Sequence, residues 1–204
     1  SAFASTDALI DVSSLWSDPR IEVCFATADT RMNPRSELLS DVRRAGTIRS
    51  NSPFESRIRE LLDAEFSAER TGASFRGFGN CDRVPEDALR APAAIFADTD
   101  LRDFGVTSIG DESLLIPLPD RRGLISGSVM NLRKIQANKD YSVARAAKAL
   151  AKVSGSETTT SQIYNLAADI DDELVSTLRD VTILHEMGHL AGLLHEERRA
   201  DARE

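Results

Sequence analysis

The chain's three histidines all lie within residues 185–195, in the order His185-Glu186-Met187-Gly188-His189-Leu190-Ala191-Gly192-Leu193-Leu194-His195. Residues four apart on a helix share one face, so His185 and His189 can present two imidazoles to a single point. Imidazole nitrogens bind zinc at about 2.0–2.1 Å. This spacing therefore predicts a zinc site carried by a helix.

The other polar and special residues of this stretch suit a catalytic rather than a structural zinc site. Glu186 lies beside the first ligand and can reach a water at the metal, where it would act as a general base. Gly192 tolerates a positive φ, so the chain can turn there and bring His195 back as the third ligand. Three protein ligands leave a fourth position for water. The alternative, three histidines on an ordinary helix, is disfavoured by the extended spacing H-E-x-x-H-x-x-G-x-x-H.

The residues around the motif predict that its helix is buried. A buried helix is a rigid platform, which metal ligands need. The apolar positions on which this prediction depends are Val181, Ile183, Leu184, Met187, Leu190, Ala191 and Leu194.

Elements earlier in the chain predict an α+β fold. Apolar or alternating runs indicate strands at 21–25, 73–78, 93–97, 113–118 and 124–132. Helices are expected at 36–45, at 141–153 and at 161–180, where Ile163, Leu166, Ile170, Leu174 and Leu178 would share a buried face. A polar Ser, Gly and Thr linker is expected at 154–161.

The clearest early helix begins near Ser52. Ser52 can cap it, Pro53 suits its first turn, and Glu55 completes a capping box. Apolar residues then recur at helical spacing as far as Phe66, and Gly72 is a natural stop. We expect one long amphipathic helix here.

Composition excludes some classes of protein. The formal net charge is −8, and no basic stripe with interleaved aromatics is present, which argues against a nucleic-acid partner. No apolar run reaches the roughly 20 residues that a membrane-spanning helix needs. A hydrophobic content of 41% suits a single domain with a packed core.

Two further groups of residues leave alternatives open. Cys24 and Cys81 could form a disulfide or remain two buried thiols. Asp98, Asp100 and Asp103 could bind Ca²⁺, but an acidic turn is the better explanation, because nothing in the spacing fixes a calcium loop.

The zinc motif resembles that of the metzincin zinc endopeptidases. Glu196, and the continuation His195-Glu196-Glu197-Arg198-Arg199-Ala200-Asp201, are most similar to the astacin-like and secreted bacterial branch. The resemblance implies a twisted mixed sheet, a long backing helix and an active-site helix. It also implies a single catalytic domain over residues 1–204, in which 133–180 would be a helical insertion.

The resemblance also concerns the residues after the motif. In astacins the residue matching Glu196 helps to anchor the mature N-terminus, although a solvated helix-end charge would explain Glu196 equally well. Metzincins carry a methionine-containing turn beyond the third histidine, whereas residues 196–204 contain no methionine. We therefore expect the C-terminal subdomain with this Met-turn to be absent from the chain. Ser128-Val129-Met130-Asn131 resembles such a turn, but it precedes the zinc helix and is expected to be strand.

The function implied is a secreted or periplasmic zinc endopeptidase, its signal peptide removed, with Glu186 as general base. A protein or peptide substrate would pair with an edge strand, for which 113–118 is the candidate, and a propeptide or inhibitor is a further expected partner. One alternative is a zinc-bound but inactive module that binds a protein partner. Another is hydrolysis of a non-peptide amide, since the same residues would serve.

Overall fold

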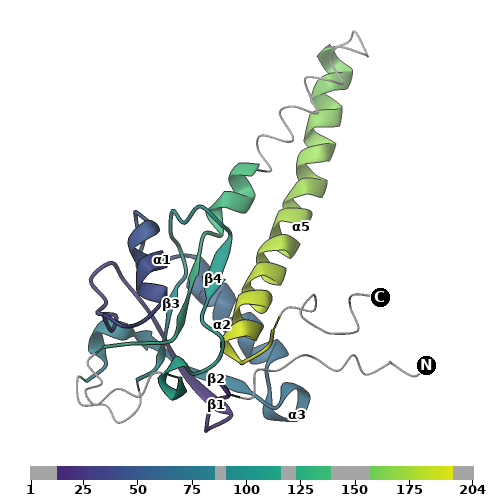
Figure 1. Cartoon of the computed structure of the whole chain (residues 1–204). Coiled ribbons are helices and arrows are strands. Elements are labelled where there is room, and N and C mark those ends of the chain that lie inside the picture. Colours follow the sequence, from purple (N-terminus) through teal and green to yellow (C-terminus); the bar gives the residue numbers. More distant parts are fainter. Residues whose placement is uncertain (1–12, 86–90, 116–122, 139–156, 195–204) are drawn as a thin grey trace, which may run out of the picture.

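A five-stranded sheet forms the centre of the molecule (Figure 1). The computed structural model describes residues 13–85, 91–115, 123–138 and 157–194. The strand order is β2-β1-β3-β5-β4, in which β4 alone runs antiparallel to its neighbour. The strands are β1 (Arg20–Phe25), β2 (Ser74–Asn80), β3 (Ala93–Phe96), β4 (Gly105–Thr107) and β5 (Gly127–Met130).

Helices cover both faces of this sheet. Helix α1 (Leu38–Arg44) packs on one face, against β5 and β4. Helices α2 (Phe54–Glu65) and α5 (Glu157–Leu190) contact each other and lie on the opposite face. Because both faces are covered, β3 and β5 are buried along their whole length, as is usual for parallel strands between helical layers.

Two apolar clusters, one on each face of the sheet, form the core. Alternate residues of a strand point to opposite faces, so Val23 joins one cluster and Cys24 the other. The larger cluster binds α2 and α5 to the sheet through residues that include Ile58, Leu62, Ile95, Met130, Ile183, Met187 and Leu190. The smaller one, beneath α1, includes Leu38, Phe96, Leu101 and Val129.

The predicted capping box of α2 is confirmed, but the helix is shorter than expected. The backbone N–H of Phe54 donates to the Ser52 hydroxyl, and Glu55 Oε1 accepts from the Ser52 N–H at 3.0 Å. Phe66 has extended backbone angles and ends the helix. Gly72, at φ +73°, closes the separate four-residue helix α3 (Ala68–Thr71) instead.

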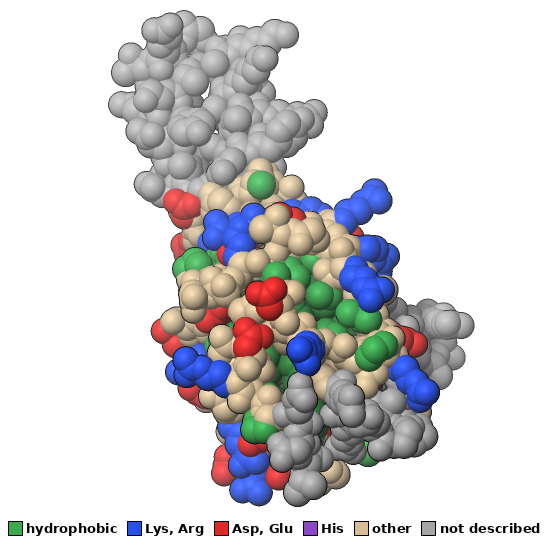
Figure 2. Space-filling view, turned by 90° about the vertical axis from the view of Figure 1, so that its left-hand side faces the viewer, with side chains coloured by type: hydrophobic (Ala, Val, Ile, Leu, Met, Phe, Trp, Pro, Cys, Tyr) green, Lys and Arg blue, Asp and Glu red, His purple; other side chains and the backbone are tan. Residues whose placement is uncertain are grey.

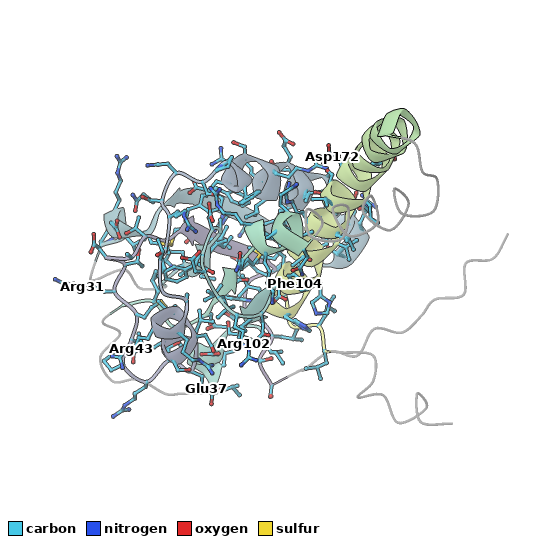
Figure 3. All side chains as sticks on the ribbon, turned by 90° about the horizontal axis from the view of Figure 1, so that it is seen from above. Arg31, Glu37, Arg43, Arg102, Phe104 and Asp172 are labelled. Carbon is cyan, nitrogen blue, oxygen red and sulfur yellow. A yellow bond between two sulfur atoms is a disulfide. The ribbon has the colours of Figure 1, made fainter. Side chains whose placement is uncertain are left out.

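Helix α5 differs from expectation in its length and in its buried face. It is continuous over 34 residues, so the linker predicted at 154–161 is wrong from residue 157 onward. Leu174, Leu178 and Val181 are exposed, contrary to prediction. These three residues lie on the side of α5 opposite the buried Val175 and Ile183. The N-terminal part of α5 also extends past the sheet, as Asp172 shows in Figure 3.

The strands at 20–25, 74–80, 93–96 and 127–130 match predictions, whereas the strand expected at 113–118 does not form over its described part. A 3₁₀ turn occupies Glu112–Leu114 instead, and 116–122 lie outside the described residues. Strand β4, which we did not predict, forms one edge of the sheet, and β2 forms the other. Residues 128–130 belong to β5, so the sequence that resembles a Met-turn is strand, as expected.

Other predictions fall on residues that are only partly described. The helix expected at 141–153 lies outside the described residues. Of the helical insertion expected at 133–180, residues 133–138 and the part of α5 from Glu157 are helical.

Cys24 and Cys81 form a disulfide, which settles the alternative left open by the sequence. Cys24 lies on β1, and Cys81 directly follows the neighbouring strand β2. The bond therefore ties two adjacent parallel strands together, on the α1 side of the sheet.

Two of the three aspartates considered as calcium ligands, Asp98 and Asp100, contact arginines instead. Asp98 is fully buried, and both of its oxygens accept hydrogen bonds from Arg133 at 2.9 Å. Arg49 lies 3.3 Å from Asp98 and 3.0 Å from Asp100. The Ser52 hydroxyl also reaches Asp98, so this carboxylate joins the end of β3 to the start of α2. The arrangement is an ion-pair cluster in which Asp98 alone is buried, Arg49 is half-buried, and Asp100 and Arg133 are exposed. Asp103 takes no part in these contacts.

The described surface carries mixed charge. Basic and acidic side chains are interspersed on the face shown in Figure 2. Among the helices of the described segments, none is both long and apolar enough to cross a bilayer.

Candidate metal centre

The imidazoles of His185 and His189 converge near the C-terminal end of α5. Their Nε2 atoms lie 3.1 Å apart, and the rings meet edge to face with centroids 4.5 Å apart. Two nitrogens bound to one tetrahedral zinc ion lie about 3.3 Å apart. The pair therefore needs little rearrangement to ligate one ion, as the four-residue spacing predicted.

Gly192 ends α5 in a Schellman motif. Its φ is +103°, in the left-handed region that favours glycine. The N–H of Gly192 donates to the carbonyl of His189 at 2.8 Å, and the N–H of Leu193 donates to that of Gly188 at 2.9 Å. These two bonds reverse the chain directly after the second histidine, so the turn expected at Gly192 is present.

The same turn orients His189. The Leu193 carbonyl oxygen lies 2.7 Å from Nδ1 of His189. Since a carbonyl can only accept, Nδ1 carries the proton and donates it, which leaves Nε2 of the neutral ring as the ligating nitrogen. A metal-binding histidine commonly has such a partner on its other nitrogen.

Glu186 points to the sheet edge and is held there. It is only 6% exposed. Its Oε2 accepts a hydrogen bond from the Thr107 hydroxyl at 2.6 Å, and Thr107 is also 2.7 Å from the hydroxyl of Ser128 on β5. The carboxylate lies so close to Gly105 that a Cβ at that position would be 2.5 Å from both Cδ and Oε1.

A pocket of about 280 Å³ brings these groups together between α5 and β4. His185, His189 and Glu186 line the pocket on the α5 side. Strand β4 forms the opposite wall and directly follows Phe104, which is labelled in Figure 3. The remaining lining comes from Gly105, Val106, Thr107, Ile109 and Leu194. The pocket thus combines nitrogen donors, one carboxylate and apolar walls beside an edge strand.

The sheet side of α5 makes the site rigid. Ile183, Met187 and Leu190 are fully buried in the larger core cluster, as predicted for the motif helix. The last carbonyls of the helix have partners outside it: Trp16 Nε1 donates to Leu190 O at 2.6 Å, and the Gly110 N–H donates to His189 O at 2.9 Å. These contacts satisfy groups that a helix end leaves without an intrahelical partner.

His195 and Glu196 lie outside the described residues, so the structure does not test the predicted third ligand or the predicted anchor. Within the described ranges, no group of three or more His, Cys, Asp or Glu side chains is arranged to hold a metal. The donors that are described nevertheless fit zinc: two imidazole nitrogens at a suitable separation, one with its ligating nitrogen set by a backbone carbonyl.

Thr107 and Gly105 are site residues that sequence reasoning missed. The only signal available was two β-branched residues, Val106 and Thr107, after a glycine, which is too short to identify a strand. Their proximity to Glu186 depends on the pairing of β4 with β5, since Thr107 lies opposite Ser128 in that pair.

Comparison of the chain with protein-family models, with curated proteins and with solved structures gave no match. Functional inference therefore depends on the site itself.

Proposed function

We propose that this chain is a zinc-dependent endopeptidase domain with a metzincin-like fold. The observation that carries the proposal is the meeting of His185 and His189 at their Nε2 atoms, in a pocket that also contains the carboxylate of Glu186. In this proposal His185, His189 and His195 hold one catalytic zinc ion. The bound ion would supply Lewis-acid polarisation of the scissile carbonyl and lower the pKa of the attacking water.

Glu186 is the residue that moves protons in this mechanism. Its carboxylate accepts a proton from the attacking water and then gives it to the leaving amine nitrogen. Glu186 is suited to this role because it is buried, shares the pocket with both histidines and has one oxygen held by Thr107. A fixed carboxylate loses less freedom when the reacting groups are brought together.

Strand β4 is the proposed binding edge for an extended peptide. It ends the strand order and pairs with β5 on one side, so a peptide can add to its other side by backbone hydrogen bonds. Residues 105–107 and Ile109 line the pocket, which places this edge beside Glu186 and the histidines. This corrects the earlier assignment of the substrate strand to 113–118.

An oxidising compartment is part of the proposal. The disulfide between Cys24 and Cys81 is typical of exported proteins, since reducing compartments keep thiols reduced. We therefore propose that the domain works in the periplasm or outside the cell, on protein or peptide substrates.

The test is cleavage of an unfolded, fluorescently labelled protein by the zinc-loaded chain and by Glu186→Gln. We expect the variant to keep stoichiometric zinc, measured by mass spectrometry of metals, and to lose at least about a hundredfold in kcat, since general base catalysis contributes at least that factor. Glu173→Gln is the matched control, because Glu173 is an exposed acid on the same helix. It should cleave as the parent chain does.

Two outcomes would contradict the proposal. Cleavage that is equal in Glu186→Gln and in the parent chain would exclude Glu186 as the base. Stoichiometric zinc without turnover of any substrate in a broad peptide library would point instead to a binding module.

A further inference from the structure

We infer that Thr107 is a positioning residue that aligns the Glu186 carboxylate for proton transfer. This inference rests on the proposed role of Glu186 as general base. It concerns how strand β4, on the far side of the pocket from the histidines' helix, controls that base.

The direction of the hydrogen bonds follows from proton counting. The Thr107 hydroxyl has a single proton, and its two neighbours are Glu186 Oε2 at 2.6 Å and the Ser128 hydroxyl at 2.7 Å. An ionised carboxylate can only accept, so Thr107 donates to Glu186 and accepts from Ser128. Ser128 is fully buried and Thr107 is half-buried, and their hydroxyls form a short hydrogen-bonded chain that ends on Oε2. Hydrogen bonds to a charged acceptor are the strong ones, and such chains reinforce each other.

Gly105 packs against the other side of the Glu186 carboxylate. A Cβ at residue 105 would lie 2.5 Å from Glu186 Oε1 and 2.6 Å from its Cγ. The end of the Glu186 side chain thus packs closely against the β4 backbone at Gly105, while Oε2 is held by Thr107. A glutamate has several rotatable bonds, and holding both the stem and one oxygen restricts it to one orientation. Both contacts with Glu186 come from β4, whose two ends are Gly105 and Thr107.

The contacts that position Glu186 are separate from the proposed metal ligands. They are made between α5, β4 and β5, and neither His185 nor His189 takes part in them. Removing the Thr107 hydroxyl should therefore leave zinc binding intact and should affect the step in which Glu186 takes part. This separates a positioning role from a general loss of structure.

The first test compares Thr107→Val with Thr107→Ser in steady-state cleavage. Valine keeps the shape but loses the hydroxyl, and one bond to a charged group corresponds to about a ten- to hundredfold effect. We expect Thr107→Val to lose about tenfold or more in kcat with KM within about twofold, and Thr107→Ser to recover most of it. Thr177→Val is the matched control, because Thr177 is exposed and its hydroxyl donates to the backbone carbonyl of Glu173, one turn earlier in the same helix. A wild-type kcat in Thr107→Val would overturn the inference, as would equal losses in the valine and serine variants.

The second test needs no activity. In metal-free protein, we measure the urea midpoint shift caused by Thr107→Val in the parent chain and in Glu186→Ala. If the two side chains are bonded, the shift is at least halved in the Glu186→Ala background. Equal shifts in both backgrounds would show that the two side chains are not coupled and would overturn the inference.

The two tests also distinguish failure of this inference from failure of the proposed function. If the zinc-loaded parent chain shows no cleavage that depends on Glu186, the proposed function is contradicted. The positioning role of Thr107 in catalysis is then contradicted as well, even if the urea experiment shows that Thr107 and Glu186 are coupled. If cleavage depends on Glu186 while the Thr107 variants behave as the parent does, only the inference falls.

Discussion

The Nδ1 atom of His189 donates its hydrogen bond to the carbonyl of Leu193, the residue directly after the glycine that ends the helix. The tautomer of a proposed metal ligand is therefore set by the geometry of a helix end. Any change that prevents the left-handed turn at Gly192 moves the Leu193 carbonyl away from the imidazole. This relationship explains why the motif needs glycine at a position that touches no ligand.

Gly192→Ala should weaken both folding and zinc binding. A left-handed residue with a Cβ costs about 1–2 kcal/mol, and the new Cβ would also lie 3.0 Å from Leu15 Cδ2. Loss of the second partner of a ligating histidine typically costs about 10–100-fold in metal affinity. Urea unfolding of the metal-free chain and zinc titration against a competing chelator measure the two effects.

Gly72→Ala is the matched control for that experiment. Gly72 has φ +73° at the end of α3, and a Cβ there meets nothing within 4 Å. Gly72→Ala should lower the free energy of unfolding by a similar amount, about 1–2 kcal/mol, and should bind zinc as the parent chain does. If the two variants bind zinc equally well, the Leu193 carbonyl does not control His189.

Gly105→Ala should disturb Glu186 while leaving the histidines in place. The added Cβ would lie 2.5 Å from the carboxylate, which must move or displace β4. We expect cleavage to fall at least about tenfold while zinc remains stoichiometric, together with a loss of about 1–3 kcal/mol typical of overpacking. Gly79 lies on β2, and a Cβ there meets nothing within 4 Å. Gly79→Ala should therefore cleave as the parent chain does and change the free energy of unfolding by less than about 0.5 kcal/mol. Parent-like cleavage by Gly105→Ala would contradict the close packing of Glu186 on β4.

The disulfide should contribute strongly to stability. Cys24 and Cys81 are separated by 57 positions, and a loop of that size corresponds to about 4 kcal/mol of unfolded-state entropy. The double variant Cys24→Ala/Cys81→Ala should lose about 2–4 kcal/mol in urea unfolding. A thiol titration of the unreduced, denatured parent chain should find no free thiol, and two thiols per chain would refute the bond.

Because of Glu112, the free energy of unfolding should fall as pH rises. Burial raises its pKa from 4.5 to about 7, and the nearby carboxylates of Glu37 and Asp111 act in the same direction. Its Oε2 has no hydrogen-bond partner among the described residues. The folded chain therefore keeps a proton that the unfolded chain releases, and this stability is present below about pH 4.5 and lost as pH approaches 7.

The check is the free energy of unfolding of the parent chain and of Glu112→Gln across this range. Because Glu112 is partly exposed, the variant should gain about 1 kcal/mol over the parent on going from acid to slightly alkaline pH. Glu37→Gln should remove part of the same pH dependence. Parallel pH profiles for the parent chain and Glu112→Gln would show that Glu112 ionises normally.

Local patterns in the sequence predicted the parts of the fold that depend on local interactions. The capping box at Ser52 and Glu55 formed as expected, because its hydrogen bonds join neighbours in the chain. The left-handed turn at Gly192 is a similar case. Strand β1 was predicted from its alternation of apolar and polar residues, and β3 from its short apolar run.

Features that depend on distant parts of the chain could not be predicted in this way. Strand β4 has three residues and exists through its pairing with β5, so neither it nor the contact of Thr107 with Glu186 left a local pattern. Leu174 and Leu178 have helical spacing but are exposed, because they lie on the side of α5 opposite the buried Val175 and Ile183. Apolar periodicity indicates a helix face, but it does not say what the face packs against.

The most direct test of the central claim is a zinc titration of the metal-free chain, monitored by metal analysis and by X-ray absorption at the zinc edge. The account predicts one tightly bound zinc ion per chain, with imidazole nitrogens at about 2.0–2.1 Å, and loss of that ion in His185→Ala and in His189→Ala. A folded chain that binds no zinc, or that retains it when both histidines are replaced, would contradict the account.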